Sequence, residues 1–335
     1  MAIGFEGEAD YRVLGVYGGP GGTVAALANG RGEVLGCGLG APADPLAHPV
    51  DEAQLRATLL AAIESARLDA GDADLGHVLV VRLGMIGSST LAAKIVSALL
   101  PYARTISESH ASSTLASVTF GGPGVCVIAG EGSVSFGRCP QGREVSIGGW
   151  GPAMGDEGSD DWIARRALAG VTKAADGRGE PTGLTACLLK QWGAPNLQEL
   201  HKSIQSPKFD RSTLATGASV VGAAAREGDA LALWILGQAA LELASLATTA
   251  LRRLSMEGPV VVGVVGGAFH AGPPLMTPFE AAVRRAHPEA SIVIPEAQPV
   301  LGALTLALMD LEVEITPEIR GRLLAGRERV AQVSM

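Results

Sequence analysis

Aromatic residues are scarce in this chain. Phe, Trp and Tyr together make up 4% of its 335 residues, although 47% are hydrophobic, and glycine alone occurs 45 times. Because glycine permits tight turns and close approach of backbones, we expect a core of small aliphatic side chains packed at short distances. A chain of this length can form two domains, each with its own core.

Positive charge is also sparse. The chain has 26 Lys and Arg residues against 34 Asp and Glu, a net charge of -8, and no run of five basic residues. Because nucleic-acid binding requires clustered cations to neutralise phosphates, we expect no nucleic-acid partner. The acidic balance is typical of a soluble cytoplasmic protein, and we expect no membrane partner.

Cysteine is rare, and its four copies include no CxxC pair, which excludes a disulfide scaffold. We expect reduced, buried thiols at these positions: Cys37, Cys126, Cys139 and Cys187. The first ten residues, MAIGFEGEAD, lack the basic start and apolar run of a signal peptide. The longest apolar stretch, 229–251, carries Gln238 and Glu242, so it is interpreted as a buried helix rather than a membrane span.

Strand-like runs and glycine turns open the chain. Residues 12–16 and 23–28 read as strands separated by a glycine turn, and a third strand starts at Val34 after an Asn-Gly hairpin signal. A glycine loop between two strands differs from a dinucleotide-binding fold, where it leads into a helix. A helix at 51–68, a strand at 78–82 and a helix from Ser88 and Ser89 to Pro101 give the order βββαβα.

The same pattern then restarts, with predicted strands at 125–129, 133–137 and 145–147 and a helix from Ser159. Two β-meanders with glycines at the first turn predict an internal structural repeat. The remaining predicted elements are helices at 182–191, 197–206, 210–226, 228–254, 276–286 and 300–311, strands at 260–265 and 291–294, and a charged tail helix from Thr316.

One long motif stands out, GGWGPAMGDEGS at 148–159, followed by Trp162. It closely resembles a block of the N-acetylglucosamine kinase and BadF/BadG ATPase group, within the actin/hexokinase-like sugar kinases. In that family this loop contributes to the sugar pocket, so the resemblance implies that Gly149, Trp150 and Asp156 bind sugar. A carboxylate and glycine backbone groups can hydrogen-bond sugar hydroxyls at close range.

Two segments resemble the family's phosphate turns. IAGEGS at 128–133 resembles IAGTGS, which implies phosphate binding by Gly130, Gly132 and Ser133. Glu131 replaces the threonine; its carboxylate repels a triphosphate but can accept hydrogen bonds from a sugar. We therefore assign Glu131 to the sugar side.

LGVYGGPGGT at 14–23 resembles LGVDGGGTKT and implies a phosphate role for Gly18, Gly19 and Thr23. Tyr17 stands where the family has the aspartate that helps to hold Mg-ATP, and Gly21 replaces a threonine. Mg-ATP is the cofactor that the resemblance implies, and Tyr17, Gly21 and Glu131 weaken its site. No residue is assigned to a metal ion.

Two shorter motifs complete the resemblance. Ser109-His110-Ala111 resembles the family's Asn-Asp-Ala, which puts His110 in the place of the catalytic base; histidine can act as a base, with an ordinary pKa near 6.5. A histidine at a helix start without a catalytic role is the alternative. Gly266 and Gly267 resemble the adenosine-binding turn, or form a plain strand-to-helix turn. The segment 36–43 lacks the asparagine that helps the family to hold the sugar, which puts N-acetylhexosamine specificity in doubt.

The predicted fold is α/β, with two actin-like (ribonuclease H-like) lobes, each built on a meander-containing mixed sheet flanked by helices, and a cleft between them. The first lobe covers 1–117, with the helix at 300–312 packed on it. The second covers 118–300 with helical insertions, and 313–335 forms a surface helix. The resemblance also implies a homodimer.

The expected function is ATP-dependent phosphorylation of a sugar or amino sugar, with altered or impaired activity. The alternative is a pseudokinase, a kinase-derived fold that binds sugar, nucleotide or a partner without phosphoryl transfer, as the changes at Tyr17, Gly21, His110 and Glu131 suggest. A dehydratase-activating ATPase is a third class. It is disfavoured because the spacing of Cys126 and Cys139 does not suit a bridging iron–sulfur cluster.

Overall fold

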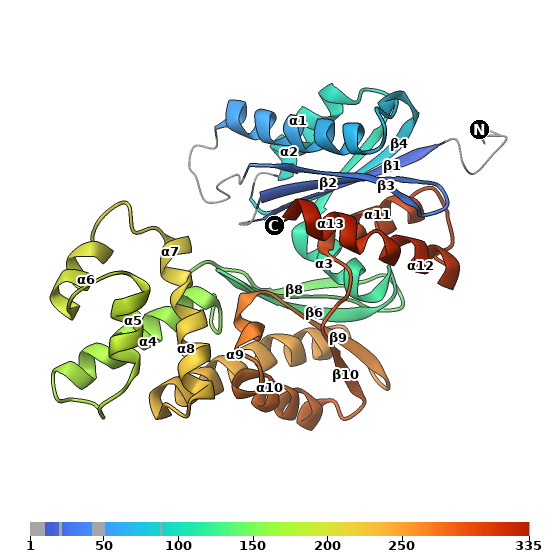
Figure 1. Cartoon of the computed structure of the whole chain (residues 1–335). Coiled ribbons are helices and arrows are strands. Elements are labelled where there is room, and N and C mark those ends of the chain that lie inside the picture. The colour runs from blue at the N-terminus through green and yellow to red at the C-terminus, as the bar shows by residue number, and fades with distance from the viewer. Residues whose placement is uncertain (1–10, 20–21, 42–50, 88, 335) are drawn as a thin grey trace. The chain divides into compact units, whose positions relative to one another are not determined.

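The computed structural model describes residues 11–19, 22–41, 51–87 and 89–334. The expectations for Gly21, for Ser88, for the first ten residues and for the end of the segment 36–43 concern residues outside this part. The chain divides into two compact units (Figure 1). Unit 1 comprises Met1–Gly122 and Pro295–Met335, and unit 2 comprises Pro123–Ile294. Each unit is described by itself.

Unit 1 contains a mixed five-stranded sheet with the order β3-β2-β1-β4-β5. Its first three strands form the predicted antiparallel meander, and β4 and β5 add in parallel. The strands are β1 (Arg12–Gly19), β2 (Gly22–Asn29), β3 (Val34–Gly40), β4 (Val78–Met85) and β5 (Arg104–Ser109). Strand β5 was not predicted, because it is an edge strand with the polar sequence RTISES and no apolar run.

Unit 2 repeats this arrangement, with the order β10-β9-β6-β7-β8. Again three strands form an antiparallel meander. A fourth strand pairs in parallel with the first strand of the meander, and a fifth pairs in parallel with the fourth. The strands are β6 (Gly124–Ala129), β7 (Ser133–Arg138), β8 (Glu144–Gly148), β9 (Val260–Val265) and β10 (Ala290–Val293). The predicted α/β class with two meander-containing mixed sheets is confirmed.

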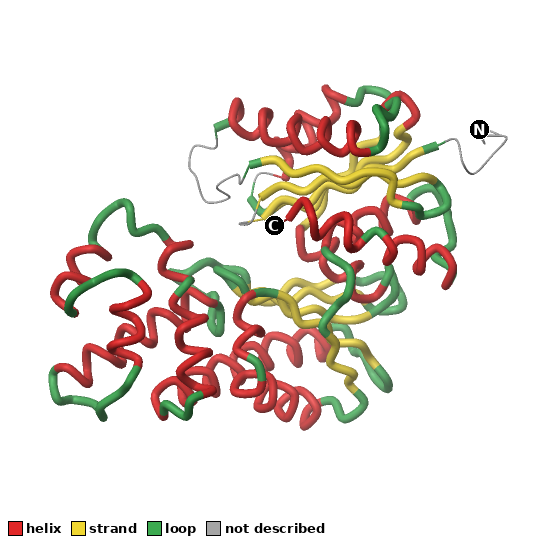
Figure 2. The backbone as a smooth tube through the Cα atoms, in the orientation of Figure 1, coloured by secondary structure: helices red, strands yellow, loops and turns green. Residues whose placement is uncertain are grey.

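Helices cover both faces of the sheet of unit 1 (Figures 1 and 2). Helices α1 (Glu52–Asp69) and α2 (Ser89–Leu99) lie on one face, and α3 (His110–Thr119) and α11 (Pro299–Met309) on the other. A Cβ atom at Gly15 would lie 2.8 Å from the Val300 carbonyl oxygen, so this glycine lets α11 pack directly on β1. The guanidinium of Arg82 donates to both Asp310, at the end of α11, and Glu108.

The C-terminal tail differs from the expected single surface helix. It forms α12 (Pro317–Ala325) and α13 (Arg327–Ser334), and each helix buries one aliphatic side chain, Leu323 and Val330, in the core of unit 1. The charged residues that suggested a surface helix are exposed, and some of them contact the rest of unit 1, since Arg329 donates to the Leu35 carbonyl and to Asp69.

In unit 2, α9 (Ala230–Arg253) and α10 (Pro273–Ala286) pack on the sheet. Helix α9 is long and apolar enough to cross a bilayer by length and composition alone, and 44% of its most apolar window is buried in the unit. An insertion of five helices lies between β8 and α9. These are α4 (Asp160–Ala175), α5 (Leu184–Gln191), α6 (Leu197–Ile204), α7 (Arg211–Ala215) and α8 (Gly217–Arg226).

The predicted single helix at 210–226 is divided at Thr216 into α7 and α8. Gly217 follows the break, where a Cβ atom would lie 2.9 Å from the ring of Trp192. The close approach requires a glycine, and glycine is a poor helix former.

Candidate functional site

In unit 1, the residues predicted around the first glycine turn lie together. Gly18 and Thr23 face each other across the β1–β2 pair, and Gly19 ends β1. A Cβ atom at Gly18 would lie 2.4 Å from the terminal methyl carbon of Met85 and 3.3 Å from the Thr23 hydroxyl oxygen. Thr23 is 1% exposed, and its hydroxyl has no hydrogen-bond partner within the described residues. The end of β1 thus holds a buried hydroxyl beside a glycine backbone.

His110 is the first residue of α3, which Ser109 caps by accepting a hydrogen bond from the Ala111 amide. The imidazole faces the Tyr17 ring, with centroids 6.5 Å apart. Burial lowers the pKa of His110 to about 4 rather than leaving it near 6.5. The imidazole is therefore neutral at neutral pH, and its affinity for a proton is close to that of an ordinary aspartate, whose pKa is about 3.9.

In unit 2, the turn between β6 and β7 joins the loop at 148–159. The Gly130 amide donates to the Gly132 carbonyl (3.0 Å) and closes the turn. The Ser133 amide donates to Asp156 Oδ1 (3.2 Å), and the Ser133 hydroxyl donates to the Glu157 carbonyl (2.8 Å). The Gly149 amide donates to the Ser133 carbonyl (2.9 Å). Two motifs distant in sequence are thereby hydrogen-bonded to each other.

Asp156 is 4% exposed and adopts a left-handed backbone conformation with φ 60°. Its second oxygen, Oδ2, accepts a hydrogen bond of 2.6 Å from Arg211, at the start of α7. The same guanidinium nitrogen donates to the carbonyl oxygen of Glu131. Trp150 lies earlier in the loop and is 71% exposed.

The second pair of predicted glycines packs against the 130–132 turn. Gly266 has φ 114°, and a Cβ atom there would lie 2.3 Å from the Ala129 carbonyl oxygen and 2.9 Å from the Gly130 nitrogen. Only glycine fits this position. Gly267 starts the short 3-10 helix η2 (Gly267–Ala271), and its own Cβ position is 2.3 Å from Asp160 Oδ2. Both glycine turns therefore meet at one end of the sheet.

A cavity of about 670 Å³ adjoins this junction. Its walls come from α4, α5, α7, α8 and η2 and are lined by Asp160, Ile163, Gln191, Ser212, Ala215, Thr216, Ala218, Ser219, Arg226, Gly267, Ala268, His270 and Ala271. Asp160 stands at the end nearest the 130–132 turn, where its amide donates to the Gly130 carbonyl (2.8 Å). Burial, together with the charge of Glu131, raises the pKa of Asp160 to about 7.

The cavity of unit 2 has the size of ordinary small-molecule sites. In unit 1, the buried Thr23 hydroxyl has no hydrogen-bond partner among the described residues. No three His, Cys, Asp or Glu side chains are grouped to hold a metal ion in the part of the chain that the structure describes. Position 17 carries a phenol where magnesium coordination needs oxygen anions.

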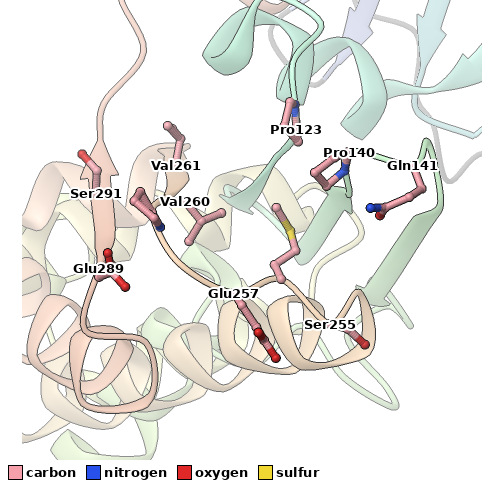
Figure 3. Close-up of a pocket in the computed structure, with 11 residues that line it drawn as sticks. Pro123, Pro140, Gln141, Ser255, Glu257, Val260, Val261, Glu289 and Ser291 are labelled. Atoms are coloured by element: carbon pink, nitrogen blue, oxygen red, sulfur yellow. The ribbon is translucent and has the colours of Figure 1, made fainter.

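A separate hollow of about 410 Å³ lies at the opposite end of the same sheet, around the start of β9 (Figure 3). Pro123, Pro140, Val260 and Glu289 are among its lining residues. None of the predicted site residues lines it.

Sequence reasoning missed Arg211 and Asp160. Asp160 had a weak signal, because two consecutive acids follow the helix cap Ser159 in the GDEGSDDW segment. Arg211 had none, because it lies 55 positions from Asp156 in a segment without a motif.

Comparison with known proteins is consistent with this geometry. The model of the BadF/BadG/BcrA/BcrD ATPase family matches residues 14–307. An N-acetylmuramic acid/N-acetylglucosamine kinase of Clostridium acetobutylicum is 31% identical over 185 residues, which cover 55% of this chain and 60% of that protein. An N-acetyl-D-glucosamine kinase of Dictyostelium discoideum is 30% identical over 188 residues, 55% of this chain and 59% of that protein.

The matched segments thus span about three fifths of each curated relative's length. Among solved structures, a candidate N-acetylglucosamine kinase of Chromobacterium violaceum aligns with a TM-score of 0.72 and 27% identity, over 89% of this chain and 99% of that one. The two-sheet architecture is that of actin-like sugar kinases, as predicted. Because the family model covers most of its length, the chain belongs to the BadF/BadG/BcrA/BcrD ATPase family.

Proposed function

We propose that this protein is an N-acetylglucosamine-kinase-like enzyme that transfers phosphate from ATP to a hydroxyl of a sugar or amino sugar. The observation that carries the proposal is the hydrogen bond from the Ser133 amide to Asp156 Oδ1, which joins the 130–132 turn to the loop at 148–159. A phosphate-binding turn and a sugar-binding carboxylate must lie side by side in such an enzyme, because the reacting atoms meet there. Family membership supports the same assignment.

On the sugar side, Asp156 is the proposed acceptor of hydrogen bonds from sugar hydroxyls. Gly149 contributes backbone next to Ser133, and the exposed indole of Trp150 offers an apolar face for a sugar ring. The Glu131 side chain is a further acceptor. An acceptor-rich set favours a polyhydroxylated substrate over an anionic one.

On the nucleotide side, the cavity beside Gly266 and Gly267 is the proposed adenosine site, and backbone groups of Gly130, Gly132 and Ser133 are proposed to face the phosphates. In unit 1, the Thr23 hydroxyl and the backbone of Gly18 and Gly19 offer further phosphate contacts. When bound, Mg-ATP would supply the phosphoryl group, and its magnesium ion would balance the charge of the phosphates.

His110 is the proposed general base. A ring nitrogen of the neutral imidazole takes the proton from the sugar hydroxyl as the hydroxyl oxygen bonds to the γ-phosphorus of ATP, and the bond from that phosphorus to the ADP oxygen breaks to release ADP. Its lowered pKa keeps it unprotonated above about pH 4, so the base is available across the neutral range.

A pseudokinase is the second candidate, and a specific observation favours it. Asp160 and Glu131 repel each other beside the 130–132 turn, and a triphosphate adds further negative charge there. Tyr17 supplies no carboxylate for magnesium. Such a protein would bind sugar or nucleotide without turnover.

Binding and turnover separate the two candidates. Calorimetric titration with a sugar panel, ADP and Mg-ATP would be followed by a coupled ADP-release assay with each sugar that binds. A turnover above about 1 s⁻¹ contradicts the pseudokinase, and sugar binding without ATP binding or turnover contradicts the kinase.

The matched variants are His110→Gln and His77→Gln, the latter at an exposed position of unit 1. If His110 is the base, only His110→Gln loses turnover, by about 10²-fold or more, while both variants keep sugar affinity. We further propose a homodimer, which sedimentation velocity of the purified protein would test, and a cytoplasmic location, which fractionation of cells that express the protein would test.

A further inference from the structure

We propose that Arg211 is a positioning residue that fixes the 130–132 turn and the Asp156 carboxylate in the one arrangement that binds sugar. This inference rests on the proposed function, because it assigns Asp156 to sugar recognition.

One guanidinium nitrogen of Arg211, Nη2, contacts both the turn and Asp156. It donates to Asp156 Oδ2 (2.6 Å) and to the Glu131 carbonyl at the tip of the turn. The Arg211 side chain is 19% exposed and that of Asp156 is 5% exposed. A charge-assisted hydrogen bond in such a desolvated place is stronger than a surface ion pair.

The two oxygens of Asp156 have different partners. Oδ1 accepts from the Ser133 amide (3.2 Å) and Oδ2 from Arg211 (2.6 Å). The carboxylate is therefore held at both oxygens, and each oxygen keeps a second lone pair for a sugar hydroxyl. Without Arg211, only one bond would remain to orient the carboxylate.

Other contacts hold the ends of the turn. The Gly130 amide donates to the Gly132 carbonyl, and the Asp160 amide donates to the Gly130 carbonyl. The contact from Arg211 reaches the carbonyl of Glu131, at the tip, and the Asp156 carboxylate is the nearest group to the Cβ position of Gly132, at 3.0 Å. Glycine turns without such support have many accessible conformations.

Arg211 reaches the site from the helical insertion. Asp210 caps α7 by accepting from the Thr213 amide (2.7 Å), which fixes the backbone that carries the guanidinium. The Nε of Arg211 lies 4.0 Å from Asp161 Oδ1, beyond hydrogen-bond distance. Asp161 instead accepts a hydrogen bond at Oδ2 from Arg165 Nε (2.8 Å). The two strong bonds of Arg211 are thus directed at the turn and at Asp156.

Arg165 provides a matched control. Its side chain is 57% exposed and pairs with Asp161 on α4. Arg165→Met removes a guanidinium and an ion pair from the same neighbourhood without removing a contact to Asp156 or to Glu131.

The experiment compares wild type, Arg211→Met, Arg211→Gln and Arg165→Met. Hydrogen exchange is followed for residues 130–133, and calorimetry measures the affinity for each sugar that wild type binds and for adenosine, which lacks the phosphates that the 130–132 turn is proposed to face. For Arg211→Met we expect exchange at 130–133 and the sugar dissociation constant to rise at least about tenfold each. Adenosine affinity should stay within about twofold, because Arg211 does not line the cavity beside Gly266 and Gly267.

Equal losses of sugar and adenosine affinity, or the same losses in Arg165→Met, would show a merely structural role and overturn the proposal. If Arg211→Met does not fold, Arg211→Gln decides: its amide is neutral and shorter than the guanidinium, so it cannot make the charge-assisted bond to Asp156, and wild-type exchange and sugar affinity there refute the inference. If wild type binds no sugar, the proposed function fails, and the sugar-positioning role fails with it. The exchange comparison then tests separately whether Arg211 orders the turn.

Discussion

Because His110 is buried, the free energy of unfolding should depend on pH, and the substitution His110→Gln should remove this part of the dependence. In the unfolded chain the imidazole takes up a proton below about pH 6.5, whereas in the folded protein it does so only near pH 4. Between these values the unfolded state binds more protons, so acidification favours unfolding. The contribution is complete above pH 6.5 and is lost progressively as the pH falls to about 4.

The size of this effect follows from the lowered pKa. One pKa unit corresponds to about 1.4 kcal/mol, so the fall from 6.5 to about 4 amounts to about 3.5 kcal/mol in total. About 2 kcal/mol of this is already lost at pH 5, where the unfolded imidazole is almost fully protonated and the folded one is not.

The assay is urea unfolding, followed by circular dichroism at about pH 7.5 and about pH 5, for wild type, His110→Gln and His77→Gln. Glutamine does not titrate, so the free energy of unfolding of wild type relative to His110→Gln should fall by about 2 kcal/mol between the two pH values. Carboxylates that titrate elsewhere cancel in this difference. A relative stability that does not change with pH, or His77→Gln behaving like His110→Gln, would refute the argument that His110 is desolvated.

Three further predictions concern other parts of the molecule. The pKa of Asp160 shifts in the opposite direction, from the ordinary 3.8 to about 7, so the stability that its proton contributes is lost as the pH rises through 7. Relative to wild type, Asp160→Asn should therefore gain about 2–3 kcal/mol between pH 5 and pH 8 in the same urea assay. Equal pH profiles would contradict this. Gly266→Ala should lower the free energy of unfolding by at least about 2 kcal/mol, because φ is 114° and Ala129 blocks the Cβ position. Gly237→Ala, in open space on α9, should be neutral or stabilising by up to about 1 kcal/mol. Tyr17→Asp should raise magnesium-dependent affinity for ADP, measured by calorimetry; no change would mean that the first glycine turn is wrongly aligned with the family.

Much of the fold could be predicted because its signals are local. Apolar runs of five or six residues between glycine turns identify the strands of both meanders, and Asp51 and Ser159 accept amide hydrogen bonds at the starts of α1 and α4. The misses have local causes too. Strand β5 is polar because it lies at a sheet edge, and the helix break at Thr216 depends on the approach of the Trp192 ring.

The site was predictable only in part. The two glycine turns and Asp156 could be proposed as site residues because each belongs to a motif of contiguous residues, and their roles stay predictions. The Arg211 contact joins segments that are distant in sequence, so no local pattern encodes it. The lowered pKa of His110 is a property of its packing, and the residue type alone indicates a value near 6.5.

Tyr17 and His110 should not be counted as two separate losses of catalytic chemistry. Their ring centroids lie 6.5 Å apart, so each side chain forms part of the other's environment. A desolvated imidazole matches the proton affinity of an aspartate without its charge. Each substitution replaces a carboxylate of the family pattern with a neutral ring, and together they remove two negative charges from one place. A site with less negative charge repels a triphosphate less. Under the proposed function, the changes in unit 1 therefore lower the repulsion that a triphosphate meets there, whereas Glu131 and Asp160 in unit 2 place negative charge beside the 130–132 turn.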